Sequence, residues 1–258
     1  MALDAWLLEQ HIQGRHPPTL RFYTWEPAAI SLGYHQRDYP DHWNDVMWHG
    51  RSLDIVQRPT GGRAVLHQGD LTYAVITSGL SGNRMESYRQ ICEFLIQGWR
   101  SLGIDLQYGK TGRGYIHNPN CFGTATAADL VLSDGYKLIG SAQKRHGSAI
   151  LQHGSIRLNP DAALFQQVFQ PESPELIAPD FWLQKASVEQ VIAALVESAK
   201  TSFGIEFQLE PLSDSEWNIL QTFSTSSPVS AMSDRAICSN PELYFSVASI
   251  AESASAAI

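Results

Sequence analysis

The amino-acid sequence predicts an α+β fold, in which helices flank a mostly antiparallel, mixed sheet. Short runs of β-branched and aromatic residues are joined by turns, other runs have helical periodicity, and hairpins outnumber strand–helix–strand units. A chain of 258 residues that is 43% hydrophobic and 17% charged is long enough to bury one large core. We therefore expect one domain over residues 1–222, followed by a Ser/Ala-rich tail over residues 223–258.

The first third of the chain is predicted to form one helix and several strands. Apolar residues recur at helical spacing within residues 1–12, and Pro17-Pro18 follows them. Glu26-Pro27 separates two β-rich runs, which predicts two strands joined by a turn. The strands expected in this third of the chain cover residues 20–25, 29–34, 53–58, 64–67 and 71–77.

Helical patterns return in the middle and towards the end of the chain. Apolar residues at three- and four-residue steps over residues 85–102 predict a long amphipathic helix that ends at Gly103. A capping box, which is a serine followed three positions later by an acidic or amide residue, marks a helix start. Two such pairs predict two further helices: Ser187 with Gln190, and Ser213 with Glu216.

A hairpin is predicted over residues 129–139, and it contains Lys137. Two β-rich runs flank Ser133-Asp134-Gly135, in which glycine supplies the positive φ of a tight turn. Strand alternation places Lys137 on the face of Ile139, so we expect the lysine to point inward, although a lone lysine in a strand is more often solvated. The small residues that follow present backbone that a ligand can approach: Gly140, Ser141 and Ala142.

The segment from Arg58 to His67, RPTGGRAVLH, places Gly61 and Gly62 between strands. Adjacent glycines bring main-chain N–H groups within reach of a ligand oxygen, and Arg58 and Arg63 stand on either side. Such a loop suits a carboxylate, a thioester carbonyl or a phosphate. A plain hairpin with solvated arginines fits the motif equally well.

Composition and spacing exclude several classes of function. The net charge of −8 argues against nonspecific nucleic-acid binding and requires a local basic patch for any anionic partner. Cys92, Cys121 and Cys238 are too far apart for a disulfide framework or a zinc site, which favours a reducing compartment. Neither a signal peptide nor a membrane-spanning run is evident, so we expect a cytoplasmic protein. The P-loop and dinucleotide-binding patterns are incomplete, and we expect no cofactor and no metal.

Together these motifs resemble the lipoate ligase and octanoyltransferase superfamily, which is related to biotin protein ligases. The segments that carry the resemblance are RPTGGRAVLH, LTYAV, KLIGSAQKR and LQHGSI, with MALDAWLLE and LRFYTWEPAAISLGYHQ before them, so it extends to about Leu158. Arg63 and Gln68 stand where the ligase branch has a third glycine and an acidic residue. The chain is therefore most similar to the cysteine-dependent octanoyl-[acyl carrier protein] transferases of Gram-positive type.

The resemblance implies a nucleophilic cysteine at Cys121 and a catalytic lysine at Lys137. An ammonium group close to a thiol lowers the pKa of that thiol and favours the reactive thiolate. Cys121 would take an octanoyl group from octanoyl-acyl carrier protein, and a lysine of a lipoyl domain or of glycine cleavage H protein would then attack the thioester. The interval of 16 positions between the two residues is one longer than in the family, and Asp129 and Ala125 replace an expected Glu and Pro. These departures leave the acyl specificity open.

Several other residues are candidates for substrate binding, and each has an ordinary structural alternative. For the oxyanion of the reacting carbonyl, the candidates are Gly61, Gly62, Gly140, Ser141 and Ala142. For the patch that meets an acidic carrier, they are Arg58, Arg63, Lys144 and Arg145, which are otherwise a solvated rim. Tyr73 would line the acyl slot or belong to the core, and His67 and His153 would position substrate or form structural hydrogen bonds.

Three other functions remain open at this point. An ATP-dependent lipoate-protein ligase would use Lys137 on an acyl adenylate and would not need Cys121. An amidotransferase would move the acyl group between lipoyl domains through the same cysteine. A noncatalytic binding module would keep the fold without the chemistry.

Overall fold

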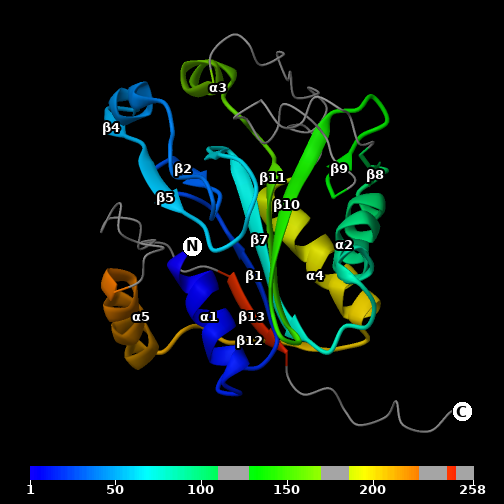
Figure 1. Ribbon diagram of the computed structural model, residues 1–258. Coiled ribbons are helices and arrows are strands. Elements are labelled where there is room, and N and C mark those ends of the chain that lie inside the picture. The colour runs from blue at the N-terminus through cyan, green and yellow to red at the C-terminus, as the bar shows by residue number, and fades with distance from the viewer. Residues whose placement is uncertain (110–127, 170–185, 227–242, 248–258) are drawn as a thin grey trace, which may run out of the picture.

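The computed structural model describes residues 1–109, 128–169, 186–226 and 243–247. Its largest part is an eight-stranded sheet with the order β12-β13-β1-β7-β11-β10-β9-β8 (Figure 1). All of its pairings are antiparallel. The strands of this sheet are β1 (Thr19–Tyr23), β7 (Asp70–Ser78), β8 (Gln107–Tyr108), β9 (Leu130–Val131), β10 (Lys137–His146), β11 (Ala149–Arg157), β12 (Phe207–Leu209) and β13 (Leu243–Val247).

Two smaller sheets and the helices complete the described part of the fold. The three-stranded sheet contains β5 (Asp54–Gln57), β2 (Ala29–Leu32) and β6 (Val65–His67), of which β5 and β2 are parallel. A short hairpin pairs β3 (Met47–Trp48) with β4 (Arg51–Ser52). The helices are α1 (Ala2–Ile12), α2 (Arg84–Ser101), α3 (Ala162–Phe169), α4 (Val188–Phe203) and α5 (Asp214–Ser226), with a 3-10 turn at Asp41–Asp45. The predicted α+β fold with a mostly antiparallel sheet is confirmed.

The two faces of the large sheet are buried by different helices (Figure 1). Because side chains alternate along a strand, Tyr73 and Val75 of β7 pack in the cluster that contains α2 and α4. Ala74 and Ile76 point the opposite way and pack in the cluster that contains α1. The central strands β7 and β11 are therefore buried on both faces and form a rigid base for the loops at their ends.

The predicted helix boundaries agree with the structure because local capping determines them. Ser187 and Gln190 form both hydrogen bonds of the capping box at the start of α4, and Gly204 ends that helix with φ of 65°. Ser213 and Glu216 form the equivalent pair of hydrogen bonds at α5. The helix predicted over residues 85–102 is α2, at Arg84–Ser101.

The predicted hairpin around Lys137 is confirmed. Val131 of β9 pairs with Lys137 and Leu130 pairs with Ile139, with a register irregularity between the two positions of β10. Farther along β10, Ser141 lies opposite Gly154 of β11. A side chain at Gly154 would place its Cβ 2.5 Å from the Ser141 Oγ, so glycine is required there for the two strands to approach.

Residues 243–247, within the predicted tail, form β13 and pair with β1 and β12. In the part of the chain that the structure describes, no helix combines the length and apolar character needed to cross a membrane.

Replacing Gly98 tests the packing of α2 on α4. A Cβ at this position would lie 2.8 Å from Leu195 Cδ2 and 3.3 Å from the Ala194 carbonyl oxygen. We expect Gly98→Leu to lower the free energy of unfolding by about 1–3 kcal/mol, because the two helices must move apart. Urea denaturation measures the change, and Gln97→Leu on the exposed side of the same turn is the control. Equal midpoints for the two variants would contradict this account of the helix interface.

Candidate active site

An open cleft of about 550 Å³ lies between the loop after β5, the first turns of α2 and residues 137–143 of β10. Residues from all three elements line it, together with the segment before β9. The lining residues predicted as site residues are Gly61, Gly62, Arg63, Lys137, Ser141 and Ala142. The structure thus brings together two motifs that are more than 70 positions apart in the sequence.

Lys137 is buried in the wall of this cleft, with an exposed fraction of 2%. Its Nζ lies 3.0 Å from Oδ1 of Asp129, which is also buried and also lines the cleft. The prediction that this lysine points inward is confirmed. A buried ammonium needs a charged partner to remain stable, and Asp129 supplies it from the facing side of the hairpin.

The glycine loop is held from behind by Arg58. Its guanidinium donates to the carbonyl oxygens of Gly61 and Arg63, at 3.0 Å and 2.6 Å from Nη2, and to the carbonyl oxygen of Ser31 at 2.9 Å from Nη1. Because the C=O and N–H of a trans peptide point in opposite directions, the N–H groups that follow these two loop carbonyls face away from Arg58. The loop therefore directs the N–H of Gly62 away from the Arg58 guanidinium.

This arrangement corrects one part of the predicted basic patch. Arg58 has an exposed fraction of only 4%, so it is not available on the surface to meet a carrier protein. Arg63, Lys144 and Arg145 are half-buried at the surface, and Lys144 lies 5.7 Å from the ring centre of Tyr34. The sequence alone does not distinguish the buried Arg58 from these three surface residues, because its hydrogen-bond partners are main-chain carbonyl groups that surround it only when the glycine loop has folded.

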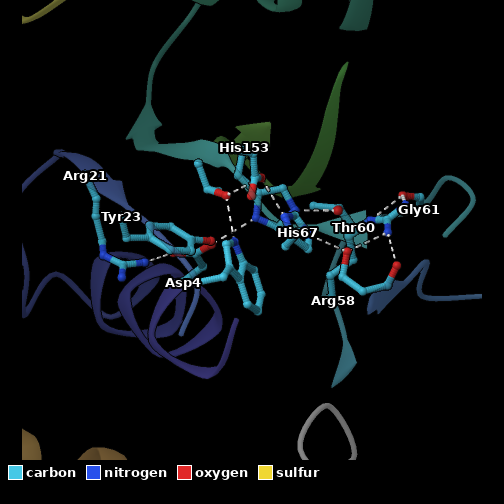
Figure 2. A network of polar contacts seen from close by, with 12 residues as sticks. Asp4, Arg21, Tyr23, Arg58, Thr60, Gly61, His67 and His153 are labelled. Atoms are coloured by element: carbon cyan, nitrogen blue, oxygen red, sulfur yellow. Dashed lines mark hydrogen bonds and ion pairs between the residues drawn. The ribbon is translucent and has the colours of Figure 1, made fainter. Parts of the chain in front are cut away.

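His153 connects the glycine loop to helix α1 through a buried chain of polar contacts (Figure 2). Its Nδ1 lies 2.9 Å from Oδ2 of Asp4, and its Nε2 lies 2.6 Å from Oγ1 of Thr60. A carboxylate only accepts, so Nδ1 donates to Asp4 and Nε2 of the neutral ring accepts from Thr60. Burial lowers the pKa of His153, which keeps the ring neutral.

Asp4 is the charged end of that chain. It forms a buried ion pair with Arg21 and accepts a hydrogen bond from the Tyr23 hydroxyl at 2.8 Å (Figure 2). Burial alone would raise the pKa of the Asp4 carboxyl, but the Arg21 charge and the His153 hydrogen bond outweigh it, and the pKa lies well below its ordinary value. Asp4 is therefore ionised throughout the physiological range.

His67 occupies the middle of a second buried chain. Its Nδ1 lies 2.8 Å from Oδ2 of Asp70 and its Nε2 lies 2.8 Å from Oγ of Ser31, while the ring stacks on Trp25 at 4.1 Å. Arg58 donates to Ser31 Oγ at 3.2 Å. The two predicted histidines thus bond to protein partners on both ring nitrogens, as expected for structural positions, and they line a small cavity of about 50 Å³ behind the loop.

On the α2 face, a third set of polar contacts lies beneath the cleft. Tyr73 is fully buried, and its hydroxyl donates to Ser141 Oγ at 2.8 Å. Gln152 Nε2 donates to Tyr73 Oη at 3.1 Å, and Gln143 Nε2 donates to Gln152 Oε1 at 3.1 Å. Burial raises the pKa of Tyr73, so its proton remains in place and supports Ser141 from below. Of the remaining candidates, Gly140 lines the small cavity behind the loop, and Ser141 and Ala142 line both that cavity and the cleft.

Cys121 lies outside the described residues, so its distance from Lys137 stays a prediction. Cys92 is described, belongs to α2 and is fully buried in the core. Burial raises the pKa of the Cys92 thiol to about 12, which keeps it protonated and unreactive.

Several residues that organise the site were not identified from the sequence: Asp4, Thr60, Asp70, Arg84 and Gln143. A signal was present for Asp4, because a carboxylate within the apolar stripe of residues 1–12 is expensive to bury without partners. For the other four residues the surrounding sequence gives no such signal, and their hydrogen-bond partners are evident only in the folded chain.

Comparison with known proteins identifies the family of this chain. The family model described as "Lipoyl protein ligase A/B catalytic domain" matches residues 1–201. The chain belongs to this family. The match includes the glycine loop, the hairpin of Lys137 and both central strands, so the predicted family is confirmed.

Similar curated proteins are named octanoyltransferase LipM. The one from Lysinibacillus sphaericus (strain C3-41) is 36% identical over 242 residues, which are 84% of this chain and 86% of that protein. The one from Bacillus subtilis (strain 168) is 36% identical over 233 residues, 82% of this chain and 83% of that protein. They confirm the predicted class of activity, octanoyl transfer in protein lipoylation.

Solved structures of lipoate-protein ligases share the fold. Lipoate-protein ligase A bound with ATP has a TM-score of 0.68 at 21% identity, over 88% of this chain and 92% of that chain. The bipartite ligase of Thermoplasma acidophilum, described with its E2 lipoyl domain, has the same TM-score and identity over 90% of this chain and 91% of that chain.

Acid denaturation tests the buried chain that ends at Asp4. The folded protein holds the pKa of this carboxyl below its unfolded value of about 3.9, so the stabilisation is complete above that pH and is lost as the pH falls further. We expect Asp4→Asn to cost about 3–5 kcal/mol at pH 7, because Arg21 then lies buried beside a neutral amide. The difference from wild type should shrink as the pH falls below about 4.

Urea denaturation at pH 7, 5 and 3 measures this difference, with Asp105→Asn as the exposed control. A stability difference between Asp4→Asn and wild type that is constant with pH would show that Asp4 does not titrate with folding.

Proposed function

We propose that this protein transfers an octanoyl group from acyl carrier protein to a lysine of a lipoyl domain or of glycine cleavage H protein, through a thioester on Cys121. The observation that carries the proposal is the position of Lys137, a buried ammonium in the wall of a cleft whose opposite wall is the glycine loop. A fixed positive charge in such a cleft favours a thiolate nucleophile and the anionic transition state of acyl transfer.

The first half-reaction exchanges one thioester for another. The Cys121 thiolate attacks the octanoyl carbonyl carbon, the bond from that carbon to the carrier sulfur breaks, and the carrier leaves as a thiolate that takes up a proton. The N–H of Gly62, directed away from Arg58, is a suitable donor to the carbonyl oxygen as its negative charge develops. The energy of the two thioesters is similar, so the step needs no ATP.

The second half-reaction forms the stable product. The neutral amine of the acceptor lysine attacks the Cys121 thioester, the carbon–sulfur bond breaks, and the cysteine leaves as a thiolate while the amine loses a proton. An amide is more stable than a thioester, so this step drives the overall transfer. Lys137 keeps the departing sulfur anionic and ready for another donor.

The rim of the cleft suits an acidic carrier despite the net charge of −8. Arg63 and Arg84 line the cleft, and Lys144 and Arg145 follow its lining residue Gln143 along β10. Arg145 donates to Ser87 Oγ at 3.0 Å and Arg84 to the Gln143 carbonyl oxygen at 3.0 Å, so both guanidinium groups are positioned on the same side. A local positive patch on a negative protein orients an acidic partner towards the cleft.

Intact-mass spectrometry after mixing with octanoyl carrier protein tests the proposal. We expect the wild-type protein to gain one octanoyl group, Cys121→Ser to gain none, and Cys92→Ala to gain one, because Cys92 is buried and protonated. Addition of a lipoyl domain should then remove the group from the enzyme. ATP-dependent loading of free lipoate without an adduct would identify a ligase instead, and a strong preference for an acylated lipoyl domain as donor would identify an amidotransferase.

Removing the Lys137 ammonium tests its part in the reaction. We expect Lys137→Met to slow adduct formation by at least about 10²-fold, a typical effect of losing one electrostatic catalytic group. Because this variant leaves the buried Asp129 opposite an apolar side chain, the double variant Lys137→Met with Asp129→Asn removes both charges and limits the loss of stability. A folded double variant that is acylated at the wild-type rate would exclude a catalytic role for Lys137.

A further inference from the structure

The cleft extends well beyond the position of Lys137. Lys137 and Gln143, both in β10, line the same cleft, and six steps along an extended strand span about 20 Å. Arg84 and Met85, in the first turn of α2, line it at the Gln143 end and are exposed. The reacting group thus lies at the buried end, and a ligand that reaches it must lie along a groove between α2 and β10.

The side chain of Gln143, which lines this groove, contains a buried hydrogen-bond acceptor. The side chain has an exposed fraction of only 7%, and its Oε1 is buried without a hydrogen-bond partner. The orientation of the amide is fixed, because Nε2 donates to Gln152 Oε1, and Gln152 Nε2 donates to Tyr73 Oη and, at 3.4 Å, to Cys92 Sγ. A buried acceptor held in one orientation is costly unless a ligand satisfies it.

The charges around Gln143 determine which donor fits. Arg84 donates to the main-chain carbonyl of Gln143 at 3.0 Å, and Arg145 follows two positions along the strand on the same face. A lysine ammonium that entered here would meet two guanidinium groups and be repelled. A neutral amide N–H followed by an anionic group would satisfy both the acceptor and the cations.

We propose that the groove between the first turn of α2 and β10 binds the prosthetic arm of the acyl donor, a thiol tether with amide groups that ends in a phosphate. Gln143 Oε1 accepts from an amide N–H of this arm, and Arg84 meets the phosphate at the exposed end. The proposal rests on the proposed function for the identity of the donor. It places the tether of the first half-reaction, and not the acceptor lysine, along β10.

A ligand that cannot react tests the groove independently of Cys121. The octyl thioether of 4′-phosphopantetheine carries the whole arm, and octyl 2-hydroxyethyl thioether carries the same chain without amides or phosphate. We expect Gln143→Met to weaken binding of the first ligand about tenfold, the effect of one lost hydrogen bond to a buried acceptor, and to leave the second unchanged. Arg84→Gln, at an exposed position, should also weaken only the first.

Isothermal titration calorimetry gives the affinities, and circular dichroism at increasing temperature establishes that each variant is folded. Gln97→Met, on an exposed position of α2, is the control and should bind both ligands as wild type does. Equal loss of affinity for both ligands in Gln143→Met, or no loss for the arm-bearing ligand in Arg84→Gln, would overturn the proposal.

Half-reaction rates separate the donor arm from the acceptor lysine. We expect Gln143→Met to slow acylation of the enzyme by octanoyl-4′-phosphopantetheine, which carries the whole arm, about tenfold, and to leave transfer from the preformed acyl-enzyme to a lipoyl domain unchanged. Slower transfer with unchanged acylation would place the acceptor lysine in the groove instead. If no acyl-enzyme forms with any donor, the thioester mechanism fails, while the thioether affinities still decide whether the groove binds the arm.

Discussion

The hydrogen bonds of the Arg58 guanidinium are the interaction on which the rest of the site depends. One side chain binds the carbonyl groups of Gly61 and Arg63 and also contacts Ser31 in the three-stranded sheet. A buried guanidinium is costly unless its donors are satisfied, and here backbone oxygens satisfy most of them. The shape of the glycine loop, and so the direction of its N–H groups, is a consequence of keeping this charge hydrogen-bonded inside the protein.

Two histidines extend this constraint to the large sheet. His153 connects Thr60, next to the loop, with Asp4 in α1, and His67 connects Ser31 with Asp70 in β7 (Figure 2). Each ring uses both nitrogens, so each fixes the distance between two separate elements. The loop is therefore positioned from the small sheet, from the N-terminal helix and from the central strands at once, which gives the precision that acyl transfer requires.

The parts of the structure that depend on local chemistry could be predicted from the sequence. The capping pair at Ser187, the hairpin turn at Gly135 and the inward direction of Lys137 follow from spacing and alternation. Contacts between distant segments could not be predicted in this way. Arginine is usually a surface residue, and only the folded glycine loop, whose carbonyl groups surround the guanidinium, shows that Arg58 is buried. The sequence contained Asp129 and Lys137, but their pairing depends on the register of β9 against β10.

The contact between Gly33 and Gly62 has a consequence for engineering the enzyme. A Cβ on Gly33 would lie 1.8 Å from the carbonyl oxygen of Gly62, so the two backbones touch where the small sheet meets the loop. Any larger residue at Gly33 or Gly62 would push the glycine loop outward and change the width of the cleft beside that loop. Libraries that aim to change the cleft should therefore keep both glycines and vary the exposed entrance at Met85, where added or removed volume leaves the scaffold intact.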